Sequence, residues 1–437
     1  MKKIVIALSV GGLLFFLFAA PPASLFAEEY SLDDLYRIAL ARSEILKVAE
    51  ENLVISEIGK DKAFSYLMPR LTATGGLTQY SEKKFSDAGS LIQPESGSSW
   101  GVRLDETVSL SGRELKALGI SKQNATKSQY DLTAIREDYL LRFVASAYYN
   151  VLMAKKVLEI ADSNLERLSK YREAAEKRLR IGEVTKTALL RAEGELSGAK
   201  SDRLQAQNGL ELAMAVLARN VGIKDDFTLP EGAAAEGDVP AMNVFREQAF
   251  AMRADLKSME VQKQIAADQT KYAEGAFWPT VSASAGYAAA DQYPPTSSLN
   301  RESIYGGVAL NFPFFEGGLR KAEVSEAKAR ERQAALFYED TKKGIGIEVQ
   351  TAYLDLVTQK GILQFLDDQV AFARDNYQAV ARQFDFGLSN SLDVLDANTL
   401  LVSSETKAVS AVYNYRLALL RMKKATGTLL ATVAATK

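Results

Sequence analysis

The sequence contains two copies of one design, and this internal repeat constrains the fold more than any other feature. At an offset of 210 residues Pro69 meets Pro279, and at an offset of 205 residues Tyr148 meets Tyr353. The change of offset corresponds to one difference of five residues between the copies. A repeat unit of roughly 190 residues is much longer than the units of solenoids and propellers. The repeat therefore predicts a duplicated domain.

The two copies share one order of predicted elements. Each begins with a helix, continues with a β-hairpin, and ends with a pair of long helices joined at a tip. We place the first copy at 28–229, with its hairpin at about 70–109 and its tip near residue 182, the linker at 230–240, and the second copy at 241–437, with its hairpin at about 280–313 and its tip near residue 387.

The first 27 residues have the layout of a secretory signal peptide. Lys2 and Lys3 precede an apolar run from Ile4 to Ala20, and a region of small residues ends at Ala27. A basic start, an apolar segment and a cleavage site make up such a signal. A retained N-terminal anchor is the alternative. Residues 28–437 lack a run of about 18 apolar residues, so we expect no transmembrane helix after cleavage. The signal peptide predicts that the mature chain leaves the cytoplasm, either free or with β-strands in a membrane.

Composition excludes several classes of function. The chain has no histidine and no cysteine, so Ser-His-Asp sites, thiolate nucleophiles, imidazole metal sites and disulfides are excluded. The net charge is −2, which gives no overall positive field for nucleic acid. We therefore expect no enzyme activity, no cofactor, no metal site and no nucleic-acid partner.

Apolar residues after each hairpin recur with the alternating spacing of a coiled coil. The first copy has Leu140 and Val144 in this pattern, and the second copy has Ile345 and Val349. Such heptads bury a narrow seam against a partner helix. A helix over 113–182 would be roughly 100 Å long at 1.5 Å per residue. A helix of this length spans a distance instead of filling a globular core.

Four stretches of about ten residues alternate apolar and polar side chains, and we interpret them as membrane strands. In one stretch, Val281, Ala283 and Ala285 alternate with serine and glycine. About ten residues is the length of a tilted transmembrane β-strand. Pro69 and Pro279 stand where two strands begin, a position at which a missing N–H is tolerated. A soluble antiparallel sheet with one wet face is the alternative.

Four strands per chain leave open edges, which lipid does not tolerate. Two chains give eight strands, with an interior filled by side chains, and three chains give twelve strands with a lumen. The trimer fits better. The predicted fold is therefore mainly α with a transmembrane β portion: long coiled-coil helices plus a twelve-stranded β-barrel shared by a homotrimer, whose apolar strand faces contact membrane lipid.

The tip of the second copy carries a distinctive motif. Residues 384–397 read Phe-Asp-Phe-Gly-Leu-Ser-Asn-Ser-Leu-Asp-Val-Leu-Asp-Ala. Together with the duplicated unit, this motif resembles the TolC family of outer-membrane efflux proteins over essentially the whole mature chain. The resemblance implies that the β-barrel of the homotrimer lies in outer-membrane lipid. It also implies that this barrel continues into a long coiled-coil α-helical barrel, which forms a large periplasmic tunnel. A further implication is a passive exit duct for a tripartite efflux pump or a type I secretion system, recruited by a periplasmic adaptor and an inner-membrane pump of the RND, ABC or MFS type.

The resemblance further implies a periplasmic gate at this tip. Asp393 and Asp396 match the paired aspartates of the family, and Phe384 stands where the family archetype has tyrosine. Ser389 replaces an arginine of that archetype, which argues against an identical salt-bridged lock and predicts a resting state that leaks more readily. The alternative for the aspartates is a solvated first helical turn, where the helix dipole favours acidic residues.

Both tips are candidates for docking the adaptor. Glycine at each tip most simply ends a helix so that the chain can reverse, and the neighbouring residues are then available to a partner. The docking candidates are Ile181, Gly182 and Val184 in the first tip and Gly387, Leu388 and Ser389 in the second.

A charged pair in one predicted strand is a separate candidate. Arg103 and Asp105 lie on the polar face of that strand. They either line the barrel lumen or form a cross-strand pair.

Two classes of function fit the sequence. The first is a passive export duct. The second is a structural coiled-coil envelope or adhesive protein without a transport pore. A duct conducts ions in a planar bilayer, and a spacer does not.

Overall fold

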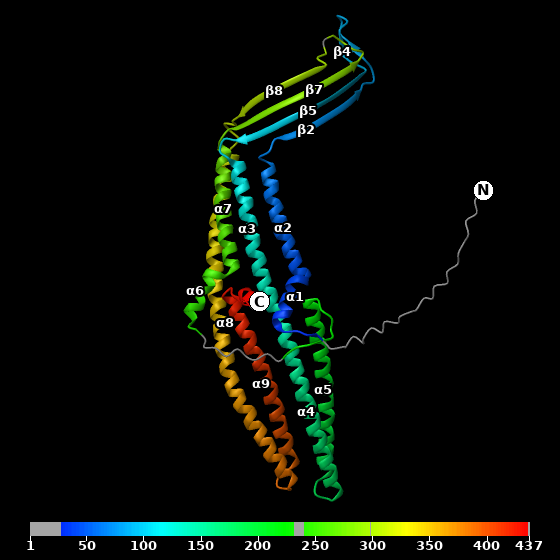
Figure 1. Cartoon of the computed structure of the whole chain (residues 1–437), viewed down its shortest axis with the longest axis vertical. Coiled ribbons are helices and arrows are strands. Elements are labelled where there is room, and N and C mark those ends of the chain that lie inside the picture. Colours follow the sequence, from blue (N-terminus) through cyan, green and yellow to red (C-terminus); the bar gives the residue numbers. More distant parts are fainter. Residues whose placement is uncertain (1–27, 231–239, 298, 436–437) are drawn as a thin grey trace, which may run out of the picture.

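The computed structural model describes residues 28–230, 240–297 and 299–435. The predicted signal peptide, 1–27, and most of the predicted linker lie outside the described residues. The molecule is elongated: a four-stranded β-sheet lies at one end, and helices run from it to two hairpin tips at the other end (Figure 1). No helix in the described part of the chain combines the length and apolar character needed to cross a membrane.

Each copy of the repeat contributes two strands to this sheet, with helices before and after them. The elements of the first copy are β1 (Glu28–Glu29), α1 (Leu32–Arg42), α2 (Glu44–Ser65), β2 (Arg70–Gln79), β3 (Lys84–Phe85), β4 (Leu91–Gln93), β5 (Ser96–Ser109), α3 (Arg113–Tyr139), a π-helical segment (Leu140–Ala145), α4 (Ser146–Arg180), α5 (Lys186–Val221) and β6 (Phe227–Thr228). Those of the second copy are α6 (Met242–Met252), α7 (Ala254–Glu274), a 3-10 turn (Gly275–Phe277), β7 (Thr280–Tyr293), β8 (Glu302–Asn311), α8 (Leu319–Asp385), α9 (Ser391–Ala425) and α10 (Leu429–Ala435).

The helix predicted before each hairpin is broken in two, which corrects the expectation of a single helix. Ser43 separates α1 from α2 and Arg253 separates α6 from α7, with ψ angles of 125° and 126°. The C-terminal end of each copy packs against the break between the two helices of the same copy. A Cβ on Gly222 would lie 3.4 Å from the Arg42 side chain, and a Cβ on Gly427 would lie 2.9 Å from the backbone nitrogen of Arg253. Both glycines have positive φ, so the turn favours glycine at both positions, and the close approach to backbone also requires it at Gly427.

The two copies differ in their long helix. In the second copy α8 is continuous over 67 residues, which is about 100 Å. In the first copy α3 and α4 are joined through the π-helical segment Leu140–Ala145, and the Ser146 hydroxyl donates to the Leu141 carbonyl at 3.1 Å. The 4,3 spacing of apolar residues is similar in both copies, so periodicity alone did not predict this interruption.

The register of the sheet confirms the predicted alternation of its strands. The strand order is β2-β5-β7-β8, and all neighbouring strands are antiparallel. Leu71 lies opposite Leu104, and Val102 lies opposite Tyr287, so the apolar positions share one face. Large side chains on this face are exposed, as in Leu77, which is 81% exposed. The sheet therefore presents one apolar face to its surroundings and one polar face.

The two central strands are longer than predicted. β5 and β7 have 14 residues each and pair from Ser96 with Tyr293 to Ser109 with Thr280. The sequence predicted about ten residues per strand, because the alternation of apolar and polar side chains ends where polar stretches begin. Backbone pairing does not depend on that alternation, and the first hairpin also contains the short β3–β4 pair.

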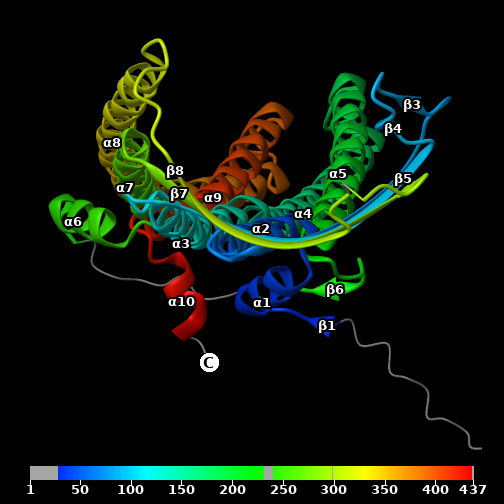
Figure 2. The same ribbon diagram turned by 90° about the horizontal axis from the view of Figure 1, so that it is seen from above.

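The helices lie side by side in the same order as the strands that they join. Next to the sheet the order is α2-α3-α7-α8, and toward the tips it is α5-α4-α9-α8. α2 leads into β2, β5 into α3, α7 into β7 and β8 into α8. Seen from above, the helices and the sheet bend in the same direction, with α8 at one side of the arc and α5 at the other (Figure 2).

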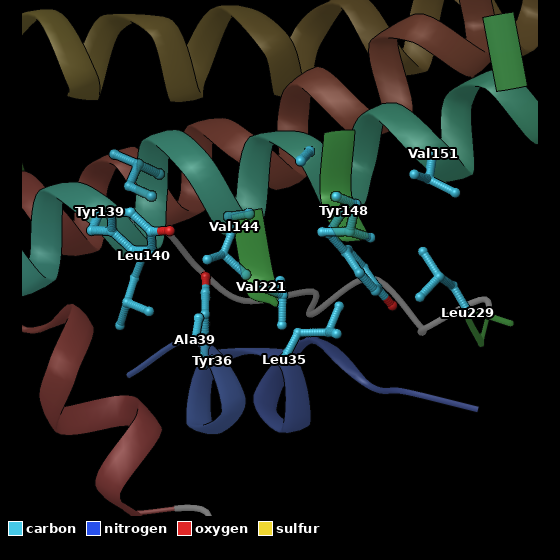
Figure 3. Packing of buried hydrophobic residues seen from close by; sticks show 14 of the residues in the cluster. Leu35, Tyr36, Ala39, Tyr139, Leu140, Val144, Tyr148, Val151, Val221 and Leu229 are labelled. Atoms are coloured by element: carbon cyan, nitrogen blue, oxygen red, sulfur yellow. The ribbon is translucent and has the colours of Figure 1, made fainter. Parts of the chain in front are cut away.

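The main core lies at mid-height, where α1 packs against the π-helical segment and α5. Leu35, Leu140, Val144 and Val221 are fully buried there. Figure 3 shows Leu35 and Tyr36 of α1 on the side of the long helix that carries Leu140 and Val144. The predicted seam is thus confirmed as a buried contact in the first copy.

A second cluster buries the equivalent seam of α8. It contains Ile345, Val349, Ala352 and Leu356, together with Ala418 of α9. Alanine in this cluster lets α8 and α9, the two antiparallel arms of the second hairpin, approach closely.

Candidate functional site

Both hairpin tips reverse the chain with the same local geometry. In the first tip Gly182 has φ 81°, and the Glu183 N–H donates to the Arg178 carbonyl at 3.0 Å. In the second tip Gly387 has φ 76°, and the Leu388 N–H donates to the Gln383 carbonyl at 2.8 Å. This is the glycine-terminated helix end, in which the left-handed residue lets the last carbonyls find donors.

The reversal leaves apolar side chains exposed at both tips. Ile181 is 69% exposed and Leu388 is 79% exposed, whereas Val184 is only partly exposed. Phe386 is 80% exposed and was not among the predicted docking residues. Its position directly before Gly387, where a helix ends, was the signal available in the sequence. The tips therefore expose three large apolar side chains within a few residues of the two glycines.

The two predicted gate aspartates differ in their contacts. Asp393 forms a capping box with Asn390: its carboxylate accepts from the Asn390 N–H at 3.2 Å, and the Asn390 side chain accepts from the Asp393 N–H at 3.1 Å. The Ser389 hydroxyl also donates to Asp393, at 3.1 Å. Asp396 lies one turn further along α9. Both carboxylates are exposed, while Val394 beside them is buried, so the acidic face points away from the packed side of α9.

Phe384 is buried and joins the two hairpins of the chain. Its ring is 3% exposed and lies 5.3 Å from the Tyr171 ring, between ring centroids. The Arg178 guanidinium lies over the same ring at 4.3 Å and donates to the Asp385 carbonyl at 2.7 Å. The Tyr171 hydroxyl donates to the Ser391 carbonyl at 3.1 Å. Aromatic packing and a cation–π contact thus fasten α4 to the α8–α9 tip.

A polar layer above the tip adds further contacts between α4 and the second hairpin. Arg167 Nε donates to the Asn398 side-chain oxygen at 2.9 Å, and Asn398 donates to Asn164 at 2.8 Å. Glu405 lies 3.1 Å from Arg374 and 3.9 Å from Arg167. Sequence reasoning missed these residues, because their partners lie on other helices. It also missed Arg178, because a basic residue in the last turn of a helix is favoured by the helix dipole alone.

The charged pair in the sheet is not a cross-strand pair. Arg103 and Asp105 lie on one strand, β5, and Arg103 Nε approaches Asp105 Oδ1 to 2.7 Å. Both belong to the polar face, because Thr72 lies opposite Arg103 and Arg70 opposite Asp105 in β2. The structure therefore places the pair along the strand, and this corrects one of the two sequence-based alternatives.

Metal binding is a further role that acidic side chains could have. In the ranges that the structure describes, no group of three or more acidic side chains is arranged to hold a metal ion.

Comparisons with known proteins agree with this architecture. The model of the outer membrane efflux protein family matches residues 35–222 and 245–428, one match in each copy of the repeat. The outer membrane efflux protein BepC of Brucella suis biovar 1 is 22% identical over 383 residues, which cover 84% of each chain. The outer membrane protein TolC of Vibrio cholerae serotype O1 is 25% identical over 324 residues, 72% of this chain and 73% of that protein.

A solved structure has the same fold. The CmeC outer membrane channel of Campylobacter jejuni superposes with a TM-score of 0.81 at 17% identity, over 91% of this chain and 86% of that one. The predicted fold of long helices with a β portion and the resemblance to TolC are thereby confirmed. Because both copies of the repeat match the family model, the chain belongs to the outer membrane efflux protein family.

Proposed function

We propose that three copies of the chain form one closed duct, the exit channel of an efflux or secretion system. The observation that carries this proposal is the shared order of strands and helices: four strands continue into four helices in the same sequence across the arc. Further copies that close the arc would therefore extend the strands into a β-barrel and the helices into an α-helical barrel at the same time. An apolar outer sheet face suits lipid, and a polar inner face suits a water-filled lumen.

The edge helices support closure by copies of the same chain. α8 exposes Leu336, Ile347, Leu354, Phe365 and Phe372. Residues 336, 354 and 372 are 18 positions apart, as are 347 and 365, which equals five turns of 3.6 residues. These residues form a straight apolar stripe along α8. Leu204 and Leu212 are exposed on α5, at the opposite side of the arc, and we assign them to the contact with α8 of the next copy.

We expect the purified, detergent-solubilised protein to be a trimer, because four strands leave two unpaired edges per chain. Light scattering that separates protein mass from detergent mass tests this. Replacing Phe365 and Phe372 by Asp places charges in the stripe and is expected to reduce the trimer. Gln364→Asp, exposed next to the stripe, is the matched control. A stable folded monomer of the unsubstituted protein contradicts the shared barrel.

We assign no catalytic role to the chain. Its proposed partners are a periplasmic adaptor at the tips and, through it, an inner-membrane pump. Ile181, Phe386 and Leu388 are the proposed contact residues, because they are apolar and exposed where the helices end. The turns around Gly182 and Gly387 hold them there, and Val184 and Ser389 lie beside them.

Asp393 and Asp396 are proposed to set the ion selectivity of the periplasmic mouth. Three copies bring six carboxylates to one axis, and like charges in a narrow mouth attract cations. We expect small, cation-selective conductance that multivalent cations block from the periplasmic side. The variant Asp393→Asn with Asp396→Asn should lose both properties in single-channel recordings.

The separate substitutions distinguish charge from helix capping. Asp396→Asn removes a charge outside the capping box, whereas Asp393→Asn also weakens the cap. Asp340→Asn, an exposed aspartate far from the tip on α8, is the control. If the double variant keeps the selectivity and block of the unsubstituted protein, these aspartates do not line the constriction.

A further inference from the structure

The polar face of the sheet carries very few charges. In the register of the four long strands, alternate residues share this face. Within β2, β5, β7 and β8 its only charged side chains are Arg70, Arg103 and Asp105. Two positive groups and one negative group leave this face with a surplus of one positive charge per chain. The acidic residues of these strands other than Asp105 belong to the apolar face.

The surplus positive charge is Arg70. Asp105 is already paired with Arg103 through the 2.7 Å contact between Nε and Oδ1. Arg70 lies directly opposite Asp105 in the neighbouring strand, and its side chain is exposed. Arg70 is also the first residue of β2, so the positive charge lies at the end of the sheet that adjoins the helices.

These residues line a hollow in the polar face. Its volume is about 540 Å³, and Arg70, Thr72, Thr74, Arg103 and Tyr305 are among its walls. The hollow thus combines two guanidinium groups, two threonine hydroxyl groups and two tyrosine rings with the Asp105 carboxylate, which Arg103 already neutralises.

Gly286 determines how the Tyr305 ring lies. A Cβ on Gly286 would be 2.7 Å from both Cζ and Oη of Tyr305. The absence of a side chain therefore lets the Tyr305 ring lie across the neighbouring strand. Gly286 stands between Arg103 and Tyr305 in the register, so the ring extends over the strand that separates it from the arginine.

We propose that this hollow binds organic anions that have an aromatic body, as they pass through the strand portion of the duct. Guanidinium groups bind carboxylate, sulfonate and phosphate groups through paired hydrogen bonds, and the tyrosine ring offers a face for stacking. The inference rests on the proposed duct, which places three such hollows around one lumen. The strand end of the duct would then favour anions, whereas the acidic tip would favour cations.

The test uses the full trimer in a planar bilayer, with 1-naphthalenesulfonate added on the side of the strands. We expect concentration-dependent block of the current. Arg70→Gln should raise the half-blocking concentration by about tenfold or more, because a hydrogen bond to a charged group is lost at the site. Gly286→Ala keeps all charges but displaces Tyr305, and should also weaken the block.

The controls separate this site from general surface charge. Arg301→Gln removes an exposed arginine outside the four strands and should leave the block unchanged. The cation 1-naphthylmethylammonium should not compete with the sulfonate. Equal block in Arg70→Gln and the unsubstituted protein overturns the inference.

The inference and the proposed duct fail in different ways. A trimer without conductance contradicts the duct. In that case, calorimetric titration of the solubilised trimer with the same sulfonate tests whether the hollow binds it. Binding that is lost in Arg70→Gln supports the anion site. Binding that is unchanged in Arg70→Gln, or no binding at all, overturns the anion site.

Discussion

Leu388→Asp is expected to abolish export while the trimer forms and reaches the membrane in normal amounts. Leu388 is 79% exposed at the tip of the second hairpin, so the substitution costs the fold little. An apolar side chain at the centre of a docking surface commonly contributes about 2 kcal/mol or more to binding. An aspartate there would be desolvated on docking, and the penalty would occur in each of the three subunits.

The measurement is dye export by whole cells that depend on this protein, together with crosslinking of the tip to the adaptor. Phe386→Asp should have a similar effect, since Phe386 is equally exposed one residue before Gly387. Gln378→Asp, exposed two turns above the tip on α8, is the control. Unchanged export and unchanged crosslinking in Leu388→Asp would show that the adaptor docks elsewhere.

Arg253→Met is expected to lower the free energy of unfolding by about 2–3 kcal/mol. The Arg253 side chain is 6% exposed and contacts both Asp255 and Glu348 at 2.6 Å. Removing one member of a fully buried ion pair costs about 3–5 kcal/mol. Asp255 and Glu348 are each 39% exposed, so water compensates part of the loss and the expected value lies below that range.

The same cluster makes stability depend on pH. Burial has the largest influence on the pKa of the Asp255 carboxyl and raises it, but the hydrogen bonds and charge of Arg253 together lower that pKa below its ordinary value. A lowered pKa stabilises the fold above the unfolded value of about 3.9 and ceases to do so as the pH falls through the folded value.

Thermal unfolding of the trimer at neutral and acid pH measures both effects. Arg330→Met is the control, because its partner Glu326 lies on the same exposed helix face and such pairs contribute only about 0.3–0.5 kcal/mol. An equal loss of stability in the two variants would contradict the conclusion that the buried ion pairs of Arg253 stabilise the fold.

The features that the sequence predicted are those that repeat with a fixed period. Alternation within each strand predicts which side chains share a face, and Leu71 and Leu104 do lie on the same face of the sheet. In the helices, the heptad period likewise places Ile345 and Val349 on one face, and both residues are buried. The offset between the copies aligns the helix breaks at Ser43 and Arg253, although hydrophobic periodicity continues across both and gave no sign of a break.

Contacts between distant segments were not predictable in this way. Phe384 belongs to the motif at 384–397, but its packing against Tyr171 and Arg178 joins residues about two hundred positions apart. No local pattern marks Arg178 as the partner. The first-copy residue equivalent to Phe384 is Leu179, so the repeat did not indicate this contact either. The side-chain contacts of the candidate gate could therefore be identified only from the three-dimensional structure.

Single-channel recording in planar bilayers tests the central claim most directly. The purified trimer should insert and give steady, small and cation-selective currents under a salt gradient, because in the proposed duct three copies would enclose a lumen with acidic groups at its periplasmic mouth. A protein that is a folded trimer by light scattering, yet gives no current above that of the empty bilayer, would instead be a coiled-coil spacer of the envelope and would contradict the proposal that this chain forms an export duct.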